Sequence, residues 1–146
     1  MQYGVDRDYP ALYLDELLQL QDFSEMSDDL MVDYVTRALV DPTSRRPSIE
    51  TLLHAFLPAK HIDHVHSDAI CALTNHANGE KAVREALGEN FAYVEWKRPG
   101  FELSKIVGQL GNYEGVVLAH HGLVVWDELS DNCYGKTLAA VAKADS

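Results

Sequence analysis

Apolar and polar residues follow two different spacings along the chain, and these spacings predict an alternation of helices and strands. Apolar residues recur three or four positions apart in several segments, two of which start at the N-cap residues Ser27 and Ser48. These segments predict helices over residues 10–21, 28–38, 48–57, 68–77, 81–87, 99–110 and 131–144. Strands are predicted around His64-Val65-His66 and over residues 91–96, which are rich in Val, Tyr and Trp.

Residues 115–126 are the most apolar part of the chain, and their pattern is compatible with two structures. It forms either two buried strands joined at His120-His121-Gly122 or one strand with a kink. Strands that alternate with helices of about ten residues are typical of a layered α/β architecture. The chain of 146 residues has no internal repeat or linker, so we expect a single domain over residues 1–146, with residues 1–8 as a lead-in outside the core.

Composition and charge narrow the class of protein. Hydrophobic residues make up 47% of the chain, yet no run reaches the roughly 18 apolar residues of a membrane span, and no signal peptide is recognisable. We therefore expect a cytoplasmic protein without a membrane partner, in which Cys71 and Cys133 are reduced thiols. A net charge of −11 argues against a nucleic-acid partner, which requires a basic surface.

Two histidines on one strand suggest half of a metal site. Side chains alternate across a strand, so His64 and His66 share a face while Val65 points the other way. A catalytic zinc site takes three protein ligands and leaves one position open. The best source of the third is His120-His121-Gly122, where glycine permits a close approach. The alternative is that these histidines are solvated or hydrogen-bonded and bind no metal.

The order of several motifs carries a family resemblance. The series Pro47-Ser48-Ile49-Glu50, the His64-x-His66 strand and His121-Gly122 after an apolar strand resembles the class II aldolase/adducin family. Residues 47–58 and 98–101 are most similar to the aldolase portion of bifunctional rhamnulose-1-phosphate aldolase/short-chain dehydrogenase proteins. The resemblance extends over residues 22–137.

The resemblance implies a fold and a set of site residues. The fold is a three-layer α/β/α domain with a mixed, partly antiparallel sheet. His64, His66 and His121 match the zinc ligands of the family, since its pattern places the third ligand directly before glycine. Glu50 matches the acidic residue that acts as general base near the metal, although a carboxylate at this place could also only complement the helix dipole. Ser48 and Arg46 are candidate substrate-binding residues, with a solvated loop as the alternative for Arg46.

The resemblance also implies an activity. It predicts a zinc-dependent lyase that cleaves or forms a carbon–carbon bond in a small sugar or sugar phosphate through an enediolate, whose charge Zn²⁺ stabilises. Epimerases, dehydratases and decarboxylases share the fold, and adducin relatives use it for assembly without catalysis. A homo-oligomer, commonly a tetramer in the family, is expected.

Both ends of the sequence depart from the family pattern. Residues 1–20 contain neither the Asn-rich strand nor the Ser-Gly turn with which the family binds the substrate phosphate, and the sequence stops at residue 146, just after the last predicted helix, where the family usually continues. We therefore expect a chain shortened at both ends that binds zinc and has weak or no aldolase activity. A truncated, non-catalytic metal-binding domain is the corresponding alternative.

Overall fold

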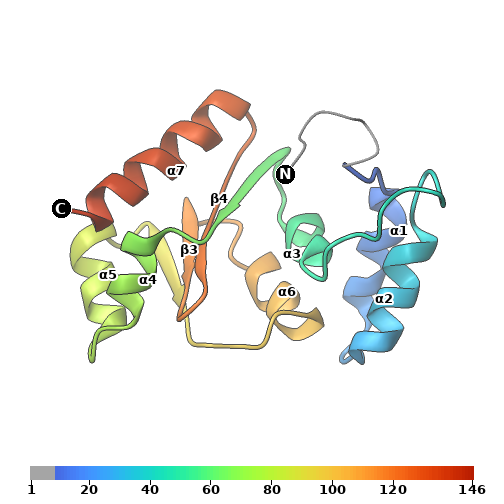
Figure 1. The fold of residues 1–146 in the computed structure, drawn as a ribbon, viewed down its shortest axis with the longest axis horizontal. Helices are drawn as coiled ribbons and strands as arrows, with labels where there is room; N and C mark the ends of the chain where they lie inside the picture. The colour runs from blue at the N-terminus through green and yellow to red at the C-terminus, as the bar shows by residue number, and fades with distance from the viewer. Residues whose placement is uncertain (1–8) are drawn as a thin grey trace. The chain divides into compact units, whose positions relative to one another are not determined.

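The computed structural model describes residues 9–146, and the chain divides into two compact units (Figure 1). Among the described residues, the first unit comprises residues 9–56 and 99–108, and the second comprises residues 57–98 and 109–146. The predicted lead-in at residues 1–8 lies outside the described residues. The single domain expected from the sequence stays a prediction.

The first unit is helical. It contains α1 (Leu14–Leu18), the 3₁₀-helix η2 (Gln19–Asp22), α2 (Asp28–Arg37), α3 (Thr51–Phe56) and α6 (Phe101–Gly108). Ser27 caps α2 as predicted, since its Oγ accepts a hydrogen bond from the backbone N–H of Leu30 at 3.3 Å. The apolar faces of the helices meet in a buried core of Leu17, Leu20, Met31, Val35, Ala38, Leu52, Phe56 and Phe101.

The second unit contains a four-stranded sheet in the order β1-β4-β3-β2. Its strands are β1 (His61–Val65), β2 (Phe91–Val94), β3 (Gly115–Leu118) and β4 (Gly122–Asp127). β4 is antiparallel to both of its neighbours, whereas β2 and β3 run parallel. The predicted α/β class with a mixed, partly antiparallel sheet is therefore confirmed. Residues 115–126 form two strands joined by a tight turn, not one kinked strand.

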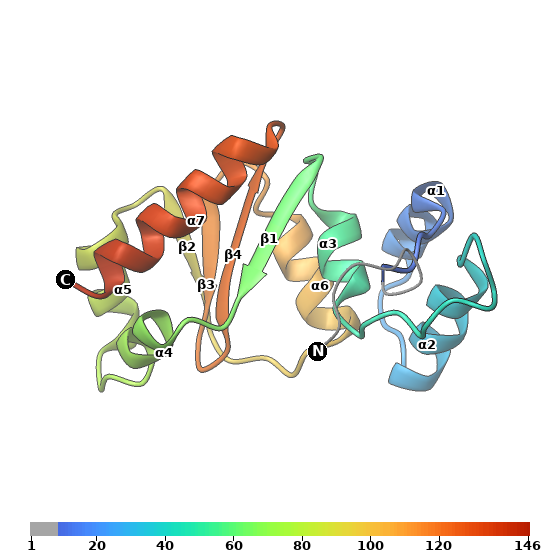
Figure 2. The same cartoon turned by 45° about the horizontal axis from the view of Figure 1, so that its top comes forward.

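Three helices cover one face of this sheet, namely α4 (Asp68–Thr74), α5 (Gly79–Leu87) and α7 (Ser130–Ala144), as Figure 2 shows. Side chains two positions apart on a strand share a face, so β4 directs Leu123 and Val125 into the same core. The helices contribute the buried residues Ile70, Val83, Leu87, Cys133 and Ala140. Cys71 and Cys133 are free cysteines, of which Cys133 is buried and Cys71 is half-buried.

The ends of several elements differ from the prediction. The helix expected over 10–21 is divided into α1 and η2. The helix expected from Ser48 begins at Thr51, because the Ser48 Oγ accepts the Glu50 N–H at 3.2 Å and its carbonyl accepts the Thr51 hydroxyl at 2.6 Å, which closes a turn first. Glu50 consequently lies in this turn and not in the first turn of the helix.

The helix expected over residues 81–87 begins two residues earlier, at Gly79. A Cβ at this position would lie 2.8 Å from the carbonyl oxygen of Thr74 and 3.2 Å from the Tyr93 hydroxyl, so the close packing of α4, α5 and β2 requires glycine here. Among the helices of residues 9–146, none has both the length and the apolar character needed to cross a membrane.

Candidate metal centre

His64 is held by the strand pairing of β1 and β4. It lies opposite Val124, and its Nδ1 is 3.1 Å from the carbonyl oxygen of Leu123. A carbonyl oxygen only accepts hydrogen bonds, so Nδ1 carries the proton in the neutral ring and Nε2 has the lone pair. A backbone carbonyl that fixes the ring in this way is the usual outer contact of a metal-binding histidine.

His66 follows β1 directly and places a second imidazole beside the first. Its Nε2 lies 3.0 Å from the Nε2 of His64, and the two ring centroids are 4.8 Å apart. Two nitrogens bound to one tetrahedral Zn²⁺ at 2.0–2.1 Å would be about 3.3 Å apart. The observed separation is therefore close to that of two ligands on one ion.

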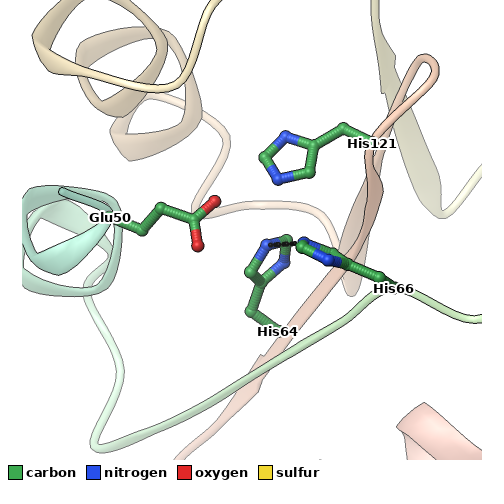
Figure 3. A group of neighbouring side chains, drawn as sticks. All are labelled: Glu50, His64, His66 and His121. Carbon is green, nitrogen blue, oxygen red and sulfur yellow. Dashed lines mark hydrogen bonds between the residues drawn. The ribbon is translucent and has the colours of Figure 1, made fainter. Parts of the chain in front are cut away.

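His121 provides the third imidazole from the turn between β3 and β4. Its ring centroid lies 5.0 Å from that of His64 and 4.8 Å from that of His66. Figure 3 shows that the three rings point toward one another, two from the segment that contains β1 and one from the β3–β4 turn.

Glycine at position 122 makes this approach possible. A Cβ there would lie 2.5 Å from the carbonyl oxygen of Val65 and 2.8 Å from the Cδ2 of His66. Any side chain at this position would push β4 away from the end of β1 and displace the His66 ring. Gly122 thus has a steric role in bringing His66 and His121 together.

The donor set of the second unit fits a metal ion. One nitrogen from each of His64, His66 and His121 lies within 4.8 Å of the others, and this arrangement forms a possible metal-binding cluster. Three imidazoles on one side of an ion suit zinc and other first-row divalent ions, with a coordination position left for water or substrate.

His120, the neighbour of His121 in the same turn, is directed toward the end of α4. Its Nδ1 lies 2.6 Å from the Oδ1 of Asn75, and its backbone N–H donates to the Thr74 Oγ1 at 3.2 Å. Sequence reasoning missed Asn75 and Thr74. Both are separated from the turn by more than 40 residues, and no motif connects them to it.

The other predicted site residues belong to the first unit. Glu50, which Figure 3 also labels, is half-buried in the turn before α3. Ser48 is exposed, and its hydroxyl accepts the Glu50 N–H, so it shapes the backbone that carries the carboxylate. Arg46 is exposed in the preceding loop. Their roles remain predictions.

The chain belongs to the class II aldolase and adducin family. The model of the class II aldolase and adducin N-terminal domain matches residues 18–144, which is most of the chain and includes all three histidines. The family predicted from the sequence motifs is thereby confirmed.

One curated relative is the uncharacterized oxidoreductase YuxG of Bacillus subtilis (strain 168). The two sequences are 42% identical over 141 residues, which cover 94% of this chain and 20% of YuxG. The chain thus spans about a fifth of the length of this relative.

Solved structures share the fold. The N-terminal class II aldolase domain of a conserved protein from Thermoplasma acidophilum is 33% identical, with a TM-score of 0.89 over 95% of this chain and 66% of that one. YgbL from Klebsiella pneumoniae, a putative aldolase/epimerase/decarboxylase, has a TM-score of 0.59 at 24% identity over 73% of this chain and 58% of its own. An aldolase II superfamily protein from Pseudomonas syringae has a TM-score of 0.60 at 14% identity, over 74% of this chain and 49% of its own. The last two likenesses concern the fold alone.

Proposed function

We propose that the protein is a zinc-dependent lyase of the class II aldolase type that acts on a small sugar or sugar phosphate. The observation that carries this proposal is the convergence of His64, His66 and His121 in one cluster. Membership of a family that is typically metal-dependent supports it. The protein is proposed to work in the cytoplasm as a homo-oligomer, as the family resemblance implies.

The three histidines would hold Zn²⁺ through their imidazole nitrogens. When bound, Zn²⁺ acts as a Lewis acid that stabilises the negative charge developing on the substrate oxygen during carbon–carbon bond cleavage. The protein contributes the orientation of the rings, and the bond between the His64 Nδ1 and the Leu123 carbonyl fixes one of them before any ligand arrives.

Glu50 is proposed as the general base of the reaction, the role that the family resemblance implies. A carboxylate takes up a proton from carbon or oxygen when it lies within hydrogen-bond reach of the substrate. The turn closed by Ser48 fixes the backbone of Glu50, which lowers the conformational entropy lost in positioning the carboxylate. The proposal extends to Ser48 and Arg46 as substrate-binding residues, the latter because a guanidinium pairs well with a phosphate.

The direct test is an aldol-cleavage assay with rhamnulose 1-phosphate and related ketose phosphates, with zinc saturating. The proposal predicts turnover that EDTA abolishes, that added zinc restores and that His66→Ala lacks. His61→Ala is the matched control, since His61 lies on the same strand and outside the cluster. Zinc binding without cleavage of any ketose phosphate would favour a non-catalytic metal-binding or assembly domain. Stereochemical inversion without cleavage would indicate an epimerase.

A further inference from the structure

The turn that presents His121 contains a strained residue. His120 has a backbone φ of 56° and is the one non-glycine residue with positive φ among residues 9–146. The N–H of His121 donates to the carbonyl of Leu118 at 3.1 Å, which closes a four-residue turn with His120 in its third position. Glycine or asparagine normally occupies this position when φ is positive, because most other side chains disfavour the left-handed region.

The C-terminal end of α4 compensates for this strain with contacts to the turn. The Asn75 Oδ1 accepts the Nδ1–H of His120 at 2.6 Å, and the Thr74 Oγ1 accepts its backbone N–H at 3.2 Å. Thr74 is 2% exposed, and its hydroxyl donates to the Cys71 carbonyl at 3.0 Å, so its lone pairs are directed toward the turn. The Cys71 Sγ approaches the carbonyl oxygen of His121 at 3.6 Å.

These contacts bear on the direction of the third imidazole. The φ of His120 determines the course of the chain into His121, and a change to negative φ would redirect the His121 side chain and the start of β4. A strained backbone that persists only because its surroundings hold it is a common feature of functional sites.

We propose that Thr74 and Asn75 are positioning residues for the metal centre: by holding His120 in the left-handed conformation, they aim His121 at His64 and His66. This inference rests on the proposed function, because it assumes that the three histidines bind a metal. It assigns to the end of α4 a role that neither residue type nor spacing indicates.

The test compares Asn75→Ala, Thr74→Val, His120→Ala and His120→Gly with the wild type. Metal affinity is measured by titration with Zn²⁺, and geometry by the visible absorption of bound Co²⁺, in proteins that circular dichroism shows to be folded. Asn75→Ala and His120→Ala should weaken zinc binding roughly tenfold or more, as loss of an outer contact does at other metal sites, and should change the Co²⁺ spectrum. His120→Gly should bind more tightly than His120→Ala, because glycine adopts positive φ without strain.

His76→Ala is the matched control, since His76 is exposed and lies next to Asn75, while its Nδ1 accepts the backbone N–H of Asn78, away from the β3–β4 turn. It should leave both readouts unchanged. Wild-type affinity and an unchanged Co²⁺ spectrum in Asn75→Ala and His120→Ala would overturn the inference while the proposed metal site stands.

A wild type that binds neither ion would instead overturn the proposed function. Hydrogen exchange of the metal-free protein then still decides whether α4 holds the turn. The amide of His121 should exchange at least several-fold faster in Asn75→Ala than in the wild type, and equal rates would refute the contact as a constraint.

Discussion

At the scale of single residues, Gly122 decides whether β1 and the β3–β4 turn can approach each other. We predict that Gly122→Ala destabilises the protein by about 1–3 kcal/mol, which is typical of overpacking. The reason is that the new Cβ would lie 2.5 Å from the Val65 carbonyl and 2.8 Å from the His66 ring. The free energy of unfolding from urea titration is the measurement.

Gly135→Ala is the control for this change. Gly135 lies within α7, and a Cβ there would have no neighbour within 4 Å. Alanine should therefore stabilise the helix by about 0.5–1 kcal/mol. If Gly122→Ala were as stable as the wild type, β1 and the β3–β4 turn could move apart without loss of stability, and the steric role of Gly122 would be wrong.

Glu50 is proposed to transfer a proton, whereas the three histidines are proposed to bind the metal. A single substitution of Glu50 distinguishes these two roles. Glu50→Gln should retain most of the zinc and lose at least about a hundredfold in turnover, since an amide hydrogen-bonds but cannot accept the proton. The measurement is kcat for ketose-phosphate cleavage with zinc saturating, next to the zinc content of the same sample. Unchanged turnover would show that Glu50 is not the general base and only forms part of the turn before α3.

The histidines illustrate what a sequence can reveal about a site. The alternation of side chains on a strand predicted that His64 and His66 share a face, and the rings do lie together. The choice of His121 over His120 came from the family pattern, and the structure directs His120 to Asn75. The contacts of Asn75 and Thr74 could not be predicted, because they depend on the tertiary packing of α4 against the turn.

At the scale of elements, helical and strand spacing predicted which segments form helices and strands, and local hydrogen bonds shifted their ends. The turn at Ser48 delays α3 to Thr51, and α5 begins at Gly79, where close packing leaves no room for a side chain. Strand order could not be predicted, because it depends on which edges meet in three dimensions. The parallel pairing of β2 with β3 across the intervening α6 is one example.

The start of α7 depends on Asp127 at the end of β4. The Nζ of Lys136 lies 2.7 Å from its Oδ2, and the Leu129 N–H donates to its Oδ1 at 3.0 Å. These contacts lower the pKa of Asp127 to about 2, and the hydrogen bond to Lys136 has the largest effect. A carboxyl with a lowered pKa in the folded state contributes stability above its unfolded pKa of about 3.9, and this contribution is lost as the pH falls toward 2.

We therefore predict that Asp127→Asn lowers the unfolding midpoint at pH 7 and that its difference from the wild type shrinks as the pH falls from 4 toward 2. The measurement is thermal unfolding of both proteins over this range. Asp145→Asn, at the other end of α7, is the control and should change the midpoint little at pH 7. A difference between Asp127→Asn and the wild type that stays constant down to pH 2 would contradict the role assigned to this carboxylate.

At the scale of the whole molecule, the chain belongs to the class II aldolase and adducin family, whose aldolases are typically metal-dependent. The chain itself spans about a fifth of the length of YuxG. Metal binding and folding are linked, because a ligand that binds only the folded state stabilises it. An excess of free zinc at 100 times its dissociation constant would add about 2.7 kcal/mol. The metal centre is therefore open to measurement independently of any substrate.

The central claim is that His64, His66 and His121 bind one metal ion per chain, and metal analysis of the purified protein after zinc loading and dialysis tests it most directly. The wild type and the His61→Ala control should retain about one zinc per chain, whereas His64→Ala, His66→Ala and His121→Ala should each retain almost none and lose the zinc-dependent rise in melting temperature. A metal-free wild type, or unchanged zinc content in the three variants, would contradict the account.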